Sequence, residues 1–190
     1  MDKITLGTRN VSIEFPGVKA LSNVDFEIET GVIHALMGAN GAGKSTLMKV
    51  LAGSNPGYTG DVLYNGNPVE LRNPAAAKKL GIQIVYQEVD MALIPTLTVA
   101  ENVMFNDLVM NMGHKQFVNY GKIRKDAKEA LARLNVNIDV RRMCGTLTLA
   151  QKQMVLIARA VQSACNFLIL DEPTAPLSDT ETEELFRVVR

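Results

Sequence analysis

The first third of the chain alternates apolar and polar residues with the period of two that is typical of β-strands. The alternation runs through residues 11–15 and 21–29, and a mostly apolar segment follows at residues 31–38. Successive side chains of a strand point to opposite faces, so the pattern predicts strands. A later strand pattern contains Asn65-Gly66, a dipeptide that favours the tight turn of a hairpin. The sequence therefore predicts an antiparallel β-region.

The period changes to that of a helix after residue 43. Leu47, Val50 and Leu51 fall on one helical face, and Gly53 is placed to end the helix. A short apolar stretch at residues 81–87 then predicts another strand. The order is strand, glycine-containing loop, helix and strand.

Residues 91–145 have the apolar spacing of helices, most clearly at residues 98–110 and 120–136. We interpret residues 91–145 as a helical subdomain. Residues 1–90 and 146–190 are then expected to form an α/β core together with the antiparallel β-region.

The last part of the chain predicts two helices around a buried strand. Thr148 and Gln151 have the spacing of a capping box at the start of the first helix, and Ser178 and Glu181 have it at the start of the second. The continuous apolar run at residues 166–170 is typical of a strand buried on both faces of a parallel sheet. The final helix has no stop signal before the last residue, so we expect a C-terminally incomplete domain.

Composition narrows the class of protein. The 190 residues are 47% hydrophobic, and 20 basic side chains balance 20 acidic ones, so nothing calls for a nucleic-acid partner. There is no signal-peptide pattern and no apolar run of membrane-spanning length. Cys144 and Cys165 show no zinc or disulfide spacing, which fits a reducing compartment. We expect a cytoplasmic protein.

The strongest chemical signal is "GANGAGKST", which matches the phosphate-binding spacing G-x-x-x-x-G-K-[ST] between a predicted strand and a predicted helix. Glycines let backbone N–H groups converge on phosphate oxygens, and the helix start adds positive potential. Lys44 would reach the β- and γ-phosphates, and Ser45 would offer its hydroxyl to Mg²⁺. The alternative is a glycine-rich turn with a surface lysine. The residues expected to bind nucleotide are Gly38, Ala39, Asn40, Gly41, Ala42, Gly43, Lys44, Ser45 and Thr46.

Two adjacent carboxylates follow the last buried strand. Alternation along an extended chain would point Asp171 and Glu172 in different directions, which allows two roles. Asp171 suits the outer shell of Mg²⁺, and Glu172 suits the general base that activates water. The alternative is an acidic turn before Pro173.

The order of "GANGAGKST", Gln87, "LTLAQKQMVLIARAV" and "LILDEPT" resembles the ATP-binding subunit of ABC transporters over almost the whole chain. The resemblance places the Thr148 helix where that family has its signature Leu-Ser-Gly-Gly-Gln, which binds the γ-phosphate of ATP held by an opposing domain. Here Leu149 and Ala150 replace both glycines, so close backbone approach is harder. A capped helix with no ligand role is the alternative, and the helix residues alone leave it open.

The same resemblance implies further roles. Phe15 matches the aromatic residue that stacks on adenine, and Gln87 matches the glutamine that contacts Mg²⁺ and the attacking water. Ser178 stands where the family usually carries an aspartate.

Together with the altered signature, the stretches "FPGVKALSNVDFEI", "LIPTLTVAENV" and "LSDTETEELF" make the chain similar to bacterial importers of ribose, galactose and xylose, in which two ATP-binding domains are fused. That likeness implies an ATPase with ATP and Mg²⁺ as ligands, a second nucleotide-binding domain, integral membrane permease subunits and a periplasmic or extracellular sugar-binding protein. It implies a peripheral place on the cytoplasmic face of the membrane. We expect residues 1–190 alone to hydrolyse ATP negligibly.

Two other functions remain open from the sequence. One is a soluble ABC ATPase acting on ribosomes or DNA, against which stand the neutral charge and the short helical segment. The other is a degenerate nucleotide-binding regulatory module without useful turnover.

Overall fold

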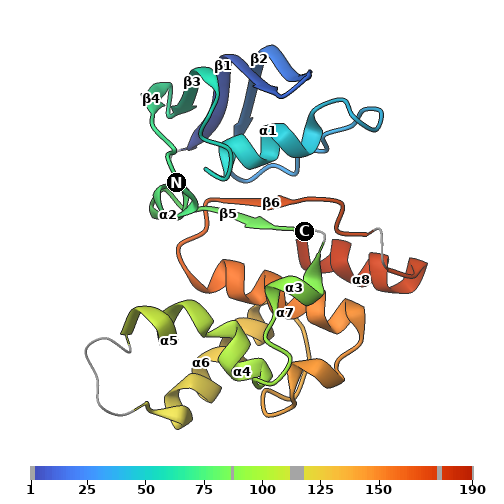
Figure 1. The fold of residues 1–190 in the computed structure, drawn as a ribbon. Helices are drawn as coiled ribbons and strands as arrows, with labels where there is room; N and C mark the ends of the chain where they lie inside the picture. The colour runs from blue at the N-terminus through green and yellow to red at the C-terminus, as the bar shows by residue number, and fades with distance from the viewer. Residues whose placement is uncertain (1–2, 87, 112–117, 175–176, 190) are drawn as a thin grey trace. The chain divides into compact units, whose positions relative to one another are not determined.

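The computed structural model describes residues 3–86, 88–111, 118–174 and 177–189. The chain divides into two compact units (Figure 1). The N-terminal unit comprises Met1–Ile84 and Cys165–Ile169. The helical unit comprises Val85–Ala164 and Leu170–Arg190.

The N-terminal unit is built on an antiparallel sheet with the strand order β2-β1-β3-β4. The predicted hairpin is confirmed, because Tyr64 pairs with Asn67 across a turn in which Asn65 has φ 51° and Gly66 has φ 72°. Both values lie in the left-handed region that Asn-Gly tolerates. The strands are β1 (Thr5–Phe15), β2 (Val18–Glu29), β3 (Thr59–Tyr64) and β4 (Asn67–Val69).

Two helices complete this unit, α1 (Lys44–Leu51) and α2 (Pro74–Lys79). The predicted α1 is confirmed, with its three apolar residues buried and Gly53 following it at φ 71°. A Cβ atom at Gly53 would lie 2.5 Å from the Asn73 carbonyl oxygen, so glycine is also required by space. The core of the unit consists of Leu6, Val11, Ile13, Leu21, Leu47, Val50, Leu51, Val62, Leu71, Ala77, Ile82 and Phe167.

The strand predicted at residues 31–38 is wrong. These residues are all described, and none of them belongs to a strand. Val32 is 54% exposed, Ile33 63% and Met37 88%. An apolar run forms a strand only where its backbone groups find a partner, and neither sheet includes this segment.

Strands β5 (Ile82–Val85) and β6 (Phe167–Leu170) pair with each other. The Phe167 amide donates to the Gly81 carbonyl at 3.1 Å and the Asp171 amide to the Val85 carbonyl at 3.1 Å, so the two strands run parallel. Both strands were predicted. Burial of β6 on both faces was not confirmed, because only Phe167 is buried and the other three residues are half-buried.

The helical unit packs short helices around α7, which contacts α3, α4 and α6. The helix expected over residues 98–110 is divided at Met104 into α4 and α5. Both predicted capping boxes form, at Thr148 before α7 and at Ser178 before α8. The elements are α3 (Val89–Ala92), α4 (Val99–Val103), α5 (Phe105–Asn111), α6 (Tyr120–Arg133), the 3-10 helix η1 (Cys144–Thr146), α7 (Leu149–Gln162) and α8 (Asp179–Val189).

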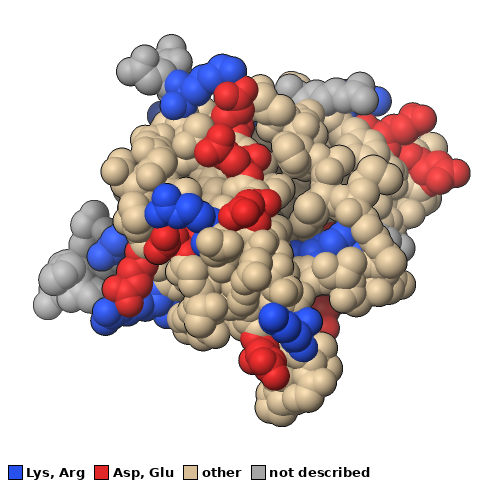
Figure 2. Space-filling view, turned by 90° about the horizontal axis from the view of Figure 1, so that it is seen from above, with Lys and Arg blue, Asp and Glu red and all other residues tan. Residues whose placement is uncertain are grey.

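None of the helices in the described parts of the chain has the length and apolar character needed to cross a membrane. Basic and acidic side chains lie interspersed on the face that Figure 2 shows, as expected for a chain with balanced charge.

Candidate functional site

The loop before α1 has a left-handed backbone, which favours glycine, at two places. Gly41 has φ 80° and Gly43, which directly precedes the helix, has φ 85°. A Cβ atom at Gly43 would lie 2.5 Å from the Ala20 carbonyl oxygen and 2.8 Å from the Leu21 Cδ2 atom. The second glycine of the motif is therefore required both by its backbone angle and by close contact with β2.

The start of α1 presents donors and no negative charge. No side chain in the described residues caps Gly43, and the first turn of the helix contains no acidic residue. The first helical hydrogen bond in this turn runs from the Leu47 amide to the Gly43 carbonyl at 2.9 Å. The amides before Leu47 and the positive end of the helix dipole are thus directed toward the loop, which suits an anion.

Lys44 folds back over the same loop. Its Nζ atom donates to the carbonyl oxygens of Gly38 at 2.8 Å and Ala39 at 2.9 Å. These acceptors are neutral, and a phosphate oxygen would be a stronger acceptor for the ammonium group. The loop, the helix start and the lysine therefore fit a phosphate chain, and Ser45 follows with a hydroxyl suited to Mg²⁺.

Phe15 lies in the same unit, at the end of β1. It pairs in register with Val18 across the turn of the β1–β2 hairpin, and it is 41% exposed. An aromatic ring with this exposure can offer a face to a planar ligand. Its predicted role in stacking on adenine stays a prediction.

Asp171 and Glu172 lie in the helical unit, directly after β6. Asp171 continues the pairing of β6 through its amide, whereas Glu172 has φ 45° and is exposed. The two carboxylates were expected to diverge through strand alternation. The strand alternation behind this expectation does not extend to these residues, because β6 ends at Leu170 and Glu172 has a left-handed backbone.

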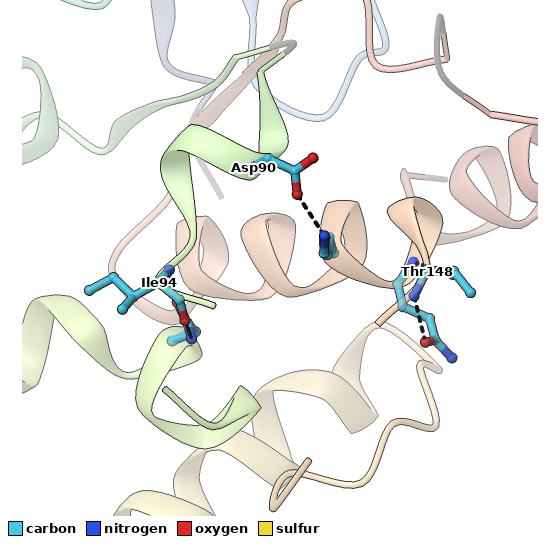
Figure 3. Close-up of polar contacts among 6 residues, drawn as sticks. Asp90, Ile94 and Thr148 are labelled. Atoms are coloured by element: carbon cyan, nitrogen blue, oxygen red, sulfur yellow. Dashed lines mark hydrogen bonds and ion pairs between the residues drawn. The ribbon is translucent and has the colours of Figure 1, made fainter. Parts of the chain in front are cut away.

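The front of α7 forms the predicted capping box. The Gln151 amide donates to Thr148 Oγ1 at 3.2 Å, and the Thr148 amide donates to Gln151 Oε1 at 3.2 Å (Figure 3). Both side chains are engaged with the helix, so the amides of Leu149 and Ala150 are the first-turn groups left for a ligand. Of the two residues that stand in place of glycines, Ala150 has a buried side chain. Leu149 is therefore the one whose side chain crowds the front of α7.

The predicted site residues thus fall into two groups. Phe15 and the nine loop and helix residues belong to the N-terminal unit, and Thr148, Gln151, Asp171 and Glu172 belong to the helical unit. Gln87 lies outside the described residues. No cluster of three or more His, Cys, Asp or Glu side chains able to hold a metal occurs in the parts of the chain that the structure describes.

The helical unit contains polar contacts that the sequence did not predict. Lys152 of α7 pairs with Asp90 of α3 at 2.6 Å, and Arg159 of α7 donates to Asn102 of α4. These partners are more than fifty residues apart, so no motif joins them. The one available signal was a polar residue, Asn102, in an otherwise apolar helical face, where it is fully buried.

Comparison with curated proteins shows close relatives. The chain is 45% identical over 185 residues to ribose import ATP-binding protein RbsA 1 of Rubrobacter xylanophilus, covering 97% of this chain and 36% of the relative. It is 43% identical over 187 residues to a putative ribose/galactose/methyl galactoside import ATP-binding protein of Agrobacterium fabrum, covering 98% and 36%. The chain spans about a third of the length of these relatives.

Solved structures show the same fold. An ATP-binding cassette of an ABC transporter in its ADP conformation matches 100% of this chain and 76% of its own, with a TM-score of 0.82 and 25% identity. The protein cbiO1 from Clostridium perfringens, part of an ABC transporter complex, matches 97% of this chain and 71% of its own, with a TM-score of 0.79 and 27% identity. The family model described as ABC transporter matches residues 21–175, from β2 to the residues after Glu172, so the chain belongs to the ABC transporter family.

Proposed function

We propose that this chain is the nucleotide-binding part of an ATP-driven importer of a monosaccharide. The observation that carries the proposal is the phosphate cradle of the N-terminal unit, in which Gly43 fits tightly against β2 and Lys44 lies over the loop at the uncapped start of α1. The names of the relatives, ribose and galactose import proteins, support the substrate class. They do not favour a role on ribosomes or DNA.

Nucleotide binding would begin with an exchange of partners at Lys44. Its ammonium group leaves two neutral carbonyl oxygens for the more strongly accepting β- and γ-phosphate oxygens. The amides at the start of α1 bind the same phosphates, and Phe15 supports the base. Because Gly43 packs against β2, the end of the loop next to α1 needs little ordering when the nucleotide binds.

Hydrolysis of ATP needs a base that accepts a proton from the attacking water, and positive charge that offsets the negative charge of the phosphate oxygens. Glu172 is proposed to take the proton of the attacking water, with Gln87 orienting that water. Ser45, Gln87 and Asp171 are the residues that would hold Mg²⁺, which supplies positive charge to the phosphate oxygens when bound. The amides of Leu149 and Ala150 are proposed to contact the γ-phosphate of a nucleotide on a second nucleotide-binding domain.

The partners follow from the proposed transport. They are a second nucleotide-binding domain, integral membrane permease subunits and, indirectly, a sugar-binding protein outside the membrane. This part of the protein would lie on the cytoplasmic face of the membrane through those subunits.

The test is transport-coupled hydrolysis by the full-length protein, assembled with its permease in proteoliposomes with the sugar-binding protein inside or outside as orientation requires. We expect MgATP hydrolysis that ribose or galactose stimulates, and loss of MgATP binding in Lys44→Ala because the cradle loses the ammonium group that lies over the loop. Lys49→Ala, which removes a lysine from the last turn of the same helix, is the matched control. Unchanged MgATP affinity of Lys44→Ala by calorimetry would refute the cradle.

A further inference from the structure

The segment that follows Gln87 in the sequence is held through its backbone by one buried side chain. Asn102 of α4 is fully buried. Its Oδ1 atom accepts from the Ile94 amide at 2.9 Å, and its Nδ2 atom donates to the carbonyl oxygens of Ile94 at 3.0 Å and Thr98 at 3.1 Å (Figure 3). An amide side chain with both ends engaged sets the path of the segment on either side of Ile94.

Arg159 extends this arrangement to α7. Its Nε atom donates to the Asn102 carbonyl at 2.6 Å, and one terminal nitrogen donates to Asn102 Oδ1 at 2.9 Å. The other terminal nitrogen donates to the Ala92 carbonyl at 2.8 Å, at the end of α3. The guanidinium also lies 5.4 Å from the centre of the Phe105 ring. One side chain therefore joins α7 to α3, α4 and the start of α5.

The contacts of Arg159 depend on the shape of the guanidinium. None of the ion pairs in the described parts of the chain involves Arg159, and its three acceptors are neutral oxygens. Burial lowers the pKa of Arg159, but an arginine remains charged in proteins. A lysine would keep the charge, yet it lacks the planar fork that reaches three acceptors at once.

A second set of backbone hydrogen bonds joins the same segment to the chain that leads into α7. The Cys144 amide donates to the Leu97 carbonyl at 3.0 Å, and the Gly145 amide donates to the Pro95 carbonyl at 3.0 Å. A Cβ atom at Gly145 would lie 3.2 Å from the Pro95 carbonyl oxygen, so these two segments of the chain are in close contact. Residues 88–98 therefore contact Arg159 within α7 and also the residues Cys144 and Gly145 that precede the helix.

We propose that Arg159 is a positioning residue for ATP hydrolysis, which holds residues 88–98 on α7 so that the segment after Gln87 and the Thr148 front of the helix move together. This inference rests on the proposed function. Arg159 contacts no nucleotide in this role. It acts through the segment, because its hydrogen bonds join the end of α3 to α4 and α7.

The experiment compares Arg159→Lys with Arg142→Lys in the full-length protein with its permease. Arg142 is an exposed arginine that donates to a backbone carbonyl, that of Thr146, at 2.8 Å, so the chemical change is matched. For Arg159→Lys we expect a kcat lower by about tenfold or more, because small displacements of reacting groups cost that much, and a KM for MgATP within about twofold. Arg142→Lys should keep both constants within about twofold.

Amide exchange separates positioning from general loss of structure. In Arg159→Lys we expect faster exchange of the Ile94 amide, with unchanged exchange in α6. Faster exchange throughout the helical unit, or a kcat equal to that of the unchanged protein, would overturn the inference. If the unchanged protein hydrolyses no ATP, the proposed function fails instead, and with it the role of Arg159.

Discussion

A comparison of two glycines in one loop tests how the phosphate cradle is held. Gly41 and Gly43 have nearly the same backbone angle, with φ 80° and φ 85°. They differ in their surroundings, because a Cβ atom at Gly41 would have no atom within 4 Å, whereas one at Gly43 would lie 2.5 Å from a backbone oxygen of β2. The substitutions Gly41→Ala and Gly43→Ala therefore share the backbone strain and differ in the clash.

The expected costs follow from these two terms. A left-handed backbone costs a residue with a Cβ atom about 1–2 kcal/mol, which applies to both variants. Forcing an extra carbon into a filled space costs a further ~1–3 kcal/mol, which applies to Gly43→Ala alone because its neighbour is backbone and moves only with β2. The difference between the variants should be about 1–3 kcal/mol, or roughly 5–150-fold in an equilibrium constant.

Hydrogen exchange of α1 in the full-length protein measures this difference locally. The Leu47 amide, which donates to the Gly43 carbonyl at 2.9 Å, reports opening of the helix start. We expect its exchange to be faster in Gly43→Ala than in Gly41→Ala by that factor, with equal exchange in α6 of the helical unit. Equal Leu47 exchange in the two variants would refute the argument that contact of Gly43 with β2 adds to the cost of the backbone angle.

Three further predictions concern single residues. Phe15→Ala should weaken binding of MgATP and leave magnesium triphosphate binding unchanged, by calorimetry, and equal loss for both ligands would point to misfolding. Glu172→Gln should keep MgATP bound and lower kcat by about 10²–10⁴, since the amide cannot take a proton; a kcat within twofold would place the base elsewhere. Hydrogen bonds from the Ser178 backbone and hydroxyl lower the pKa of Glu181 from 4.5. The ionised carboxylate therefore stabilises the start of α8 at a pH above 4.5, and this stabilisation is lost as the pH falls through the lowered pKa. Exchange of α8 amides should accelerate in acid, and Glu181→Gln, whose side chain cannot titrate in this range, should reduce the pH dependence; an unchanged dependence in that variant would contradict the assignment.

The features that the sequence determined by itself are local. The Asn65-Gly66 turn, the α1 helix with its three buried residues, and the capping boxes of α7 and α8 all depend on residues within four positions of one another. Side-chain and backbone preferences at such short range hardly depend on the rest of the fold. The phosphate-binding spacing belongs to this class too, because glycine angles and a following helix start are properties of one short segment.

Tertiary structure decided what depends on partners far away in the chain. The apolar run at residues 31–38 predicts a strand, but a strand also needs a neighbour to pair with, and the segment has none in either sheet. Glu172 adopts a left-handed backbone that neither its residue type nor the pattern of the preceding strand predicts. Arg159 donates hydrogen bonds to Asn102, which is fifty-seven residues earlier in the sequence, and the packing of α7 on α4 brings the two residues together. In each case the outcome depends on which segments become neighbours when the chain folds, and a local sequence pattern does not contain that information.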